Sequence, residues 1–236
     1  MINTNTIVRF LSFALVMTST QALFAAEPNS TDNSSPVPRF AIGAEIGTAG
    51  YGPVTVFTVS KHFTVDVGYT WMSYSYDYTN SDADYNAKLK LSNIQGRINW
   101  HPFAGTFHLS AGAFQTDNKI DLVGKPKAGG NFSIGDADYT AAQVGNLTGT
   151  AEIGSGVAPF VGLGWSKTPA KKGFGFFFDV GVLFIDAPTV TMNVTGPIAI
   201  DPTFKANLQK EIRDMNDDLS SYKYYPIVQL GLLYRF

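Results

Sequence analysis

The last eleven residues, 226–236, alternate two kinds of side chain and end on a phenylalanine. One face of the extended chain carries the apolar residues Val228, Leu230, Leu232, Tyr234 and Phe236. The opposite face carries Gln229, Gly231, Leu233 and Arg235. A strand that meets lipid on one side and a polar lumen on the other has this pattern. The segment therefore predicts a strand of a membrane-embedded β-barrel.

The N-terminal 26 residues have the organisation of a cleavable secretory signal. Arg9 precedes an apolar run over residues 10–17, which is too short to cross a bilayer as a helix, and small residues follow up to Ala26. We expect residues 1–26 to be a signal peptide and the polar, proline-punctuated residues 27–38 to be a flexible periplasmic leader. The signal holds one of the 17 basic residues and none of the 19 acidic ones, so the mature chain is slightly acidic and nucleic acid is not an expected partner.

Residues 39–236 are long enough for one domain and contain no stretch that could span a bilayer as a helix. Only helices and closed sheets satisfy backbone hydrogen-bonding groups in lipid, so a membrane-embedded domain here must be a barrel. The composition agrees, because aromatic residues make up 14% of the chain while its mean hydropathy is only +0.01. The absence of cysteine excludes disulfides and thiolate metal sites.

Eight alternating segments can be traced through this region. The clearest internal one places Ile94, Ile98 and Trp100 opposite Asn93, Gln95, Arg97 and Asn99. Short turns alternate with mostly longer connections, which we expect at 48–53, 79–86, 124–147 and 195–221. The expected fold is an all-β, eight-stranded, antiparallel up-and-down transmembrane barrel, located in the outer membrane with both termini in the periplasm.

Residues 202–220 break the alternation and have helical spacing instead. Phe204, Leu208 and Ile212 fall on one side, with Met215 and Leu219 roughly following. The segment predicts a short helix in the last external loop. It is either a lid or partner-binding helix, or an ordered loop element that packs on the barrel rim.

The inward faces of the expected strands supply the candidate functional residues. The charged or titratable members are Glu45, Asp66, Arg97, His108, Glu152, Asp179 and Arg235. The uncharged polar members are Asn93, Gln95, Asn99 and Gln229. Charges inside a barrel need partners or water, so Arg97 and Arg235 should have carboxylate neighbours, and Asp179 and Glu45 are the candidates for Arg235.

We expect this interior to serve as a narrow channel that admits small solutes, with a plugged structural or surface-interaction barrel as the alternative. The acidic excess favours a narrow, weakly cation-preferring passage, since side chains nearly fill an eight-stranded barrel and a general porin is excluded. Alternatively, the same residues form a structural plug, and loops 124–147 and 195–221 contact partners. The three histidines do not cluster, and Ser110 and His108 lie too far apart along one strand for a routine hydrogen bond, so no catalytic residues, metal or cofactor are expected.

Several segments resemble the CarO family: residues 42–52 (IGAEIGTAGYG), 65–71 (VDVGYTW), 158–165 (APFVGLGW) and 175–194. The resemblance covers most of the mature chain, although the long loops diverge. It implies a small eight-stranded outer-membrane channel that is associated with carbapenem susceptibility and with uptake of basic amino acids such as ornithine. The terminal phenylalanine also suits the small barrels of the OmpW and OmpA type.

The expected partners follow from this location. They are outer-membrane lipid and lipopolysaccharide, small solutes, and the barrel insertion machinery, for which Tyr234 and Phe236 would be the signal. The chain is expected to act as a monomer.

Overall fold

A computed structural model describes residues 40–79, 83–127 and 129–236 of the chain. The proposed signal peptide and leader, 1–26 and 27–38, lie outside the described residues. Within the described residues, no helix combines the length and the hydropathy needed to cross a bilayer.

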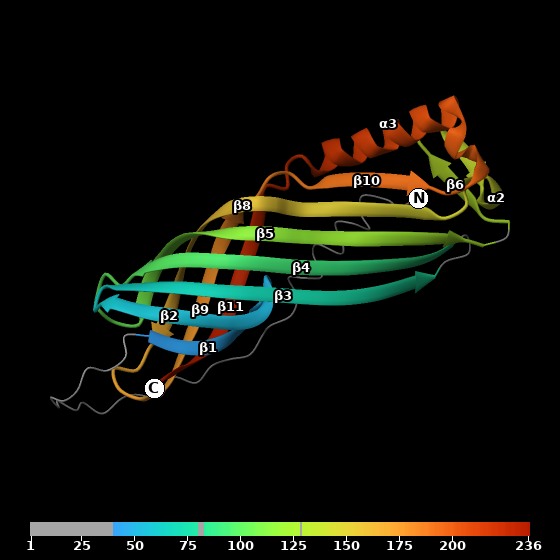
Figure 1. The fold of residues 1–236 in the computed structure, drawn as a ribbon. Coiled ribbons are helices and arrows are strands. Elements are labelled where there is room, and N and C mark those ends of the chain that lie inside the picture. Colours follow the sequence, from blue (N-terminus) through green and yellow to red (C-terminus); the bar gives the residue numbers. More distant parts are fainter. Residues whose placement is uncertain (1–39, 80–82, 128) are drawn as a thin grey trace.

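Eight strands close into an antiparallel barrel (Figure 1). In chain order they are β1 (Phe40–Gly47), β2 (Gly50–Ser60), β3 (Phe63–Thr79), β4 (Ala83–Trp100), β5 (Phe107–Pro126), β8 (Leu147–Lys167), β9 (Gly173–Phe184) and β11 (Tyr224–Arg235). Each pairs with the next strand in this order, and β1 closes the barrel on β11. The predicted fold class and strand number are confirmed.

The two ends of the barrel differ in their connections. One end, here called the turn end, holds the short turns at 61–62, 101–106 and 168–172, together with Phe40 and Phe236. The other, the loop end, holds every longer connection. The first described residue and the C-terminus therefore lie at the same end, because Ile42 pairs with Tyr234 across β1 and β11.

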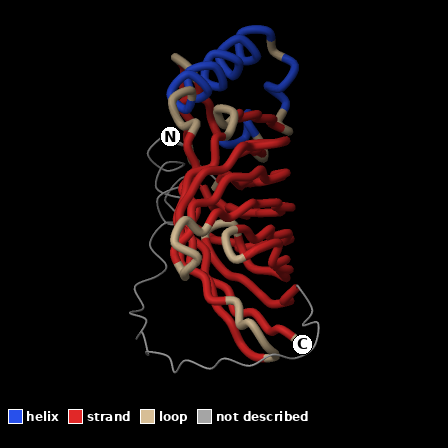
Figure 2. The backbone as a smooth tube through the Cα atoms, turned by 90° about the vertical axis from the view of Figure 1, so that its left-hand side faces the viewer, coloured by secondary structure: helices blue, strands red, loops and turns tan. Residues whose placement is uncertain are grey.

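Four strands continue beyond the barrel at the loop end, where they form an open sheet (Figures 1 and 2). These are β3, β4, β5 and β8, and β10 (Thr189–Val194) extends the sheet by pairing with β8. A hairpin of β6 (Asn131–Ile134) and β7 (Ala137–Thr140), the short helices α2 (Ala141–Val144) and η1 (Pro197–Ile200), and helix α3 (Pro202–Leu219) complete this part. We call it the external layer.

The connections are more ordered than the sequence suggests. The first one is only Thr48 and Ala49, because Gly50 adopts a φ of 106° and lets β2 begin at once. Strand β3 ends at Thr79 and strand β4 begins at Ala83, so the expected loop at 79–86 is largely strand. The expected loop at 124–147 contains the β6–β7 hairpin and α2.

The outer surface of the barrel is apolar and ringed by aromatic side chains. At the turn end the ring contains Phe63, Trp100, Phe107, Trp165, Phe174, Tyr234 and Phe236. At the loop end it contains Tyr51, Tyr69, Trp71, Phe184 and Tyr224. Phe63 and Trp71 are eight residues apart on β3, roughly 26 Å along the strand. This spacing and the exposed aliphatic residues between the rings, such as Leu232 at 68% exposed, are typical of a lipid-facing belt.

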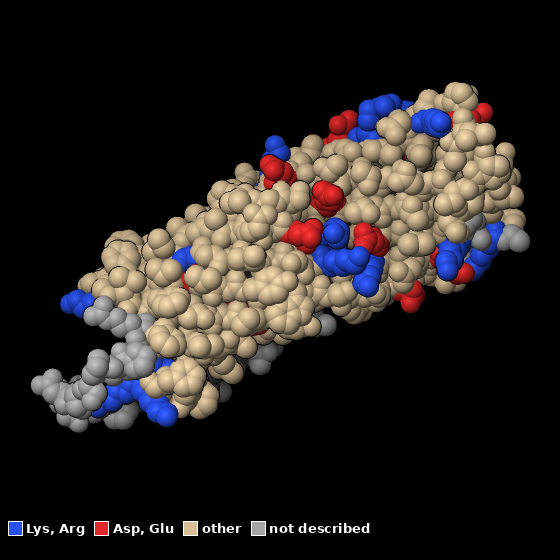
Figure 3. Space-filling view, viewed as in Figure 1, with Lys and Arg blue, Asp and Glu red and all other residues tan. Residues whose placement is uncertain are grey.

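Charged residues begin immediately beyond that belt on the outer face of β4 and β5. Lys90 and Asp121 form an exposed salt bridge of 2.6 Å there, and Lys119 lies 3.5 Å from Asp117. In Figure 3, charged atoms gather in the middle of the molecule and at its ends, while the surface over the barrel is almost free of them. The external layer therefore projects out of the apolar zone.

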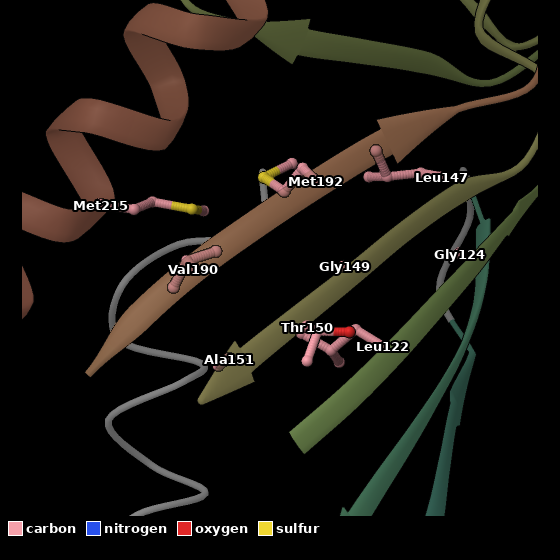
Figure 4. Close-up of a pocket in the computed structure, with 9 residues that line it drawn as sticks. All are labelled: Leu122, Gly124, Leu147, Gly149, Thr150, Ala151, Val190, Met192 and Met215. Carbon is pink, nitrogen blue, oxygen red and sulfur yellow. The ribbon is translucent and has the colours of Figure 1, made fainter. Parts of the chain in front are cut away.

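The concave face of the external layer is covered by a hydrophobic core that continues into the loop end of the barrel, where Phe114, Phe160 and Ile227 belong to the same cluster. The inward positions of β4, β5 and β8 change from polar to apolar toward the loop end, at Leu89, Leu122 and Ala151. Met215 of α3 lies over Val190 and Met192 of β10 (Figure 4). The space among these side chains has a volume of about 10 Å³, room for no more than one water molecule.

Helix α3 confirms the predicted helix at 202–220 almost residue for residue. Its predicted apolar side chains Phe204, Leu208, Met215 and Leu219 are buried against the external layer. Asn216 covers the free edge of β10, since its side-chain oxygen accepts from the backbone N–H of Val190 at 2.7 Å. The helix is thus an ordered element, as one of the two alternatives expects, but it packs on β10 and β6 of the external layer and not on the barrel rim. A role as a lid or partner-binding helix stays a prediction.

The Asp201 carboxylate caps the N-terminus of α3 by accepting from the backbone N–H of Phe204 at 2.8 Å. We expect Asp201→Ala to cost about 1 kcal/mol of helix stability, because a lost N-cap leaves that donor without a partner. Hydrogen exchange of the α3 amides is the measurement, with Asp214→Ala, an exposed change on the same helix, as the control. Equal protection in the two variants would contradict the assignment of the cap.

Candidate functional site

The interior of the barrel is organised around Arg97, whose side chain is fully buried. Its Nη1 donates to Asp179 Oδ2 at 2.7 Å and to Gln229 Oε1 at 3.1 Å. Its Nη2 lies 3.3 Å from Asp66 Oδ2 and 4.0 Å from Glu45 Oε2. One guanidinium group from β4 thus gathers carboxylates from β1, β3 and β9.

Hydrogen bonds from neighbouring polar side chains hold these carboxylates in place. Asn99 donates to Asp66 Oδ2 at 2.6 Å, and His108 Nε2 lies 2.8 Å from Asp179 Oδ1. Gln95 donates to Glu45 Oε1 and accepts from Gln229 at 3.2 Å. We call the whole set the plug: Glu45, Asp66, Gln95, Arg97, Asn99, His108, Asp179 and Gln229.

Aromatic rings and glycines close the space around the plug. The guanidinium carbon of Arg97 lies 6.0 Å from the ring centre of Phe160 and 5.6 Å from that of Phe177. A Cβ on Gly231 would lie 2.1 Å from the Phe177 ring, so only glycine leaves room for that ring. The plug is therefore enclosed by apolar groups as well as by the strands, and its charges act in a region of low dielectric.

Toward the loop end, a smaller polar layer is covered by the β1–β2 turn. The carbonyl oxygen of Ala49 accepts from Thr70 Oγ1 at 2.9 Å and from Asn93 Nδ2 at 3.0 Å. Asn118 donates to Asn93 Oδ1 at 3.0 Å. The turn that carries Ala49 folds over the interior, which closes the barrel on this side in the structure.

Toward the turn end, His101 lies beside His108 of the plug, with ring centres 5.1 Å apart. His101 belongs to the 101–106 turn, and burial lowers its pKa from the usual value, so its ring is neutral at pH 7. Its Nδ1 lies 3.0 Å from the carbonyl oxygen of Gly105. These contacts fix the turn against the interior.

The contacts of His108 run in the order of a catalytic triad, since Ser166 Oγ lies 3.4 Å from its Nδ1 and Asp179 on its other side. The carboxylate of Asp179, however, is also bound to Arg97, and His108 is only 1% exposed. A substrate carbonyl cannot reach an imidazole enclosed in this way. Ser110, the other serine near His108, donates to Asn99 at 2.7 Å instead. His108 and Asp179 are therefore members of the plug, and the two serines contact its edge.

Most of the predicted inward residues are buried in the barrel interior. Asn93, Gln95, Arg97, Asn99, His108, Glu45, Asp66, Asp179 and Gln229 are all at most 4% exposed. Arg235 is also inward but stands apart at the turn end, where it donates to Thr58. Its expected partners, Asp179 and Glu45, are both engaged by Arg97 instead.

Glu152 contradicts the prediction, because it is exposed on the outer face. Its neighbour Ile153 is buried in its place. Asp117 of β5 pairs with Ser155 of β8, but Lys119 pairs with Glu152, so two residues of β8 oppose the single residue Asn118 of β5. This bulge, at which Gly154 and Gly156 have φ of 69° and 114°, reverses which side chains point inward.

The sequence reasoning missed several members of the interior. Thr64, Asn118, Phe160 and Phe177 are all buried and contact the predicted polar residues. Thr64 has the same parity as Asp66 and could have been found by that rule. Phe160 and Phe177 have inward parity too, but the expected inward set was limited to polar and charged residues.

Comparisons with known proteins support the fold. No protein-family profile and no curated protein sequence matches the chain. The crystal structure of Acinetobacter baumannii CarO2 is 20% identical, with a TM-score of 0.57, over 86% of this chain and 100% of that chain. Acinetobacter baumannii CarO is 24% identical, with a TM-score of 0.55, over 85% of this chain and 98% of that chain. This chain therefore shares the eight-stranded barrel fold of the CarO structures, in agreement with the resemblance of its sequence.

Proposed function

We propose that this protein is a CarO-type outer-membrane barrel of a Gram-negative bacterium whose lumen is closed by the plug and which presents the external layer at the cell surface. The observation that carries the proposal is the enclosure of Arg97 and its three carboxylates, whose side chains are at most 5% exposed. A permanently open passage would hydrate these groups. Of the two functions open from the sequence, the plugged barrel with surface interactions is the better supported.

Its orientation and its general partners are part of the same proposal. The turn end would face the periplasm, since short turns and both termini occur there in outer-membrane barrels. Lipid would contact the apolar belt, lipopolysaccharide would meet the charged residues around Lys90 and Asp121, and the insertion machinery would read the strand that ends in Tyr234 and Phe236. The segments 124–147 and 195–221, folded into the external layer, would carry contacts with partners. The chain would act as a monomer.

A second candidate function is slow passage of small cationic solutes, including basic amino acids such as ornithine. Three carboxylates surround one arginine in the plug, and this acidic surplus favours cations. Passage would require the Arg97–Asp179 pair to separate, because both groups lie across the lumen from each other on β4 and β9.

Planar-bilayer recording separates the two functions. We expect no discrete conductance from the wild type, whereas Arg97→Ala/Asp179→Ala, which removes the shortest ion pair of the plug, should conduct because water can enter the vacated space. The control Lys90→Ala/Asp121→Ala removes an exposed pair of the same kind and should stay silent.

Uptake of labelled ornithine into proteoliposomes is the complementary measurement. If the wild type conducts as well as the plug variant and also takes up ornithine, the closed-barrel function is wrong and the passage of cationic solutes is the function. Silence of both proteins would show that side chains other than the Arg97–Asp179 pair keep the lumen shut.

A further inference from the structure

The plug has more acidic than basic groups. Among residues 40–79, 83–127 and 129–236, the carboxylates of Glu45, Asp66 and Asp179 find their salt-bridge partners in Arg97 and His108. Even if His108 carries a positive charge, one negative charge remains uncompensated. A surplus charge in an enclosed site is costly unless it is neutralised.

Two oxygen atoms show where the surplus lies. Glu45 Oε2 and Asp66 Oδ1 are buried and have no hydrogen-bond partner among the residues that the structure describes. Their carboxyl groups approach the same nitrogen atom, Arg97 Nη2, at 4.0 Å and 3.3 Å. The third carboxylate differs, because both oxygens of Asp179 are occupied, by Arg97 and by His108. The unsatisfied acceptors thus belong to two carboxyl groups at one site.

We propose that Glu45 and Asp66 together hold one proton in the folded barrel. Two carboxyl groups that share a site cannot both ionise at low cost, and one bound proton turns an unsatisfied acceptor into a donor. Glu45 is the group that carries the proton. It lies farther from Arg97, and within the described part of the chain it accepts only from the neutral amide of Gln95, whereas Asp66 accepts from both Asn99 and Arg97.

The groups that face this pair from the other strands act in both directions. Arg97 on β4 opposes the uptake of a proton, Asp179 on β9 favours it, and His108 on β5 is tied to Asp179. Gln95, Asn99 and Gln229 are neutral. A metal ion is a less suitable occupant, since the described residues contain no group of three side chains placed to ligate one.

The bound proton makes stability depend on pH in a defined direction. In the unfolded chain a glutamate is ionised above about pH 4.3, while the folded pair keeps its proton to higher pH. The folded state then binds one more proton than the unfolded state, so stability falls as pH rises from that point until the pair releases its proton. For one proton, the folded-to-unfolded ratio falls up to about tenfold per pH unit.

Glu45→Gln is the decisive variant, because glutamine imitates a protonated glutamate in shape and charge. Unfolding by urea in detergent micelles, followed by tryptophan fluorescence, would be measured between about pH 5 and about pH 9. We expect the folded-to-unfolded ratio of the wild type to fall by up to about tenfold per pH unit as the pH rises. This contribution should be missing from Glu45→Gln. Glu152→Gln, which neutralises an exposed glutamate, should behave as the wild type. Difference infrared spectra should contain a protonated-carboxyl band in the wild type that is missing from Glu45→Gln.

The outcomes separate this proposal from its alternatives. A wild type with the same pH dependence as Glu45→Gln and no protonated-carboxyl band would overturn it. So would a Glu45→Gln protein that does not fold while Glu152→Gln does. If stability depends on sodium concentration and not on pH, a bound metal cation, and not a proton, neutralises the surplus negative charge of Glu45 and Asp66. The proposal rests on the closed plug of the proposed function, but its readouts are stability and a carboxyl band while the proposed function is tested by conductance, so the two can fail separately.

Discussion

Arg97→Met is expected to lower the free energy of unfolding by about 3–5 kcal/mol, because it leaves buried carboxylates without their cation. The side chain contacts three carboxyl groups and the rings of Phe160 and Phe177, so no other single change removes as many interactions from the plug. Urea unfolding in detergent micelles, followed by the fluorescence of the belt tryptophans, is the measurement.

The matched control for Arg97 is Lys90→Met. Lys90 also forms a salt bridge, with Asp121 at 2.6 Å, but the two side chains are 41% and 31% exposed. Its loss should cost less than about 1 kcal/mol, because water screens an exposed pair. Similar costs for the two methionine variants would mean that water reaches the plug. Adding Asp179→Asn to Arg97→Met should recover part of the loss, because it removes one of the stranded charges.

Phe204→Ala is expected to destabilise the docking of α3 by about 3–5 kcal/mol, because it empties the centre of the external layer. Phe204 is 1% exposed and meets the ring of Tyr139 edge-on, with ring centres 4.9 Å apart. The same helix is tied to the β6–β7 hairpin by Asn207, which donates to the Tyr139 hydroxyl at 2.7 Å. Hydrogen exchange should show lost protection in α3, β6 and β7.

Ile200→Ala is the control for Phe204, since Ile200 precedes the same helix and is 82% exposed. It should leave protection unchanged. The amides of β1 and β11 should stay protected in both variants, because their hydrogen bonds belong to the closed barrel. Lost protection in these two strands after Phe204→Ala would contradict the view that the external layer can loosen alone.

The sequence predicted the barrel well because the period of a strand is fixed by backbone geometry. In β11 every outward residue from Val228 to Tyr234 and every inward polar residue was assigned to its correct face. In β4 the same rule found Asn93, Gln95, Arg97 and Asn99. Lipid on one face and a crowded interior on the other impose this alternation directly on the residue types.

The rule failed where the backbone departs from a regular ladder. Glu152 was assigned inward because it has the same parity as Gly162 and Gly164, but the bulge at Gly154–Gly156 inserts one residue between them. Arg235 was expected to meet Asp179 because β11 pairs with β9. The register instead places Arg235 opposite Gly173 and Gln229 opposite Asp179. Registers are set by turns and bulges over the whole sheet, which local patterns do not reveal.

The sequence alone determined the architecture, which is a closed sheet with a polar interior and an apolar exterior, together with a helix near the end of the chain. What only the tertiary structure decided is which interior groups meet. Arg97 and Asp179 are 82 residues apart in the chain, and Arg97 and Gln229 are 132 apart. Contacts across a lumen depend on strand stagger, closure and side-chain length together, so the plug and its uncompensated carboxyl pair appear only once the barrel is closed.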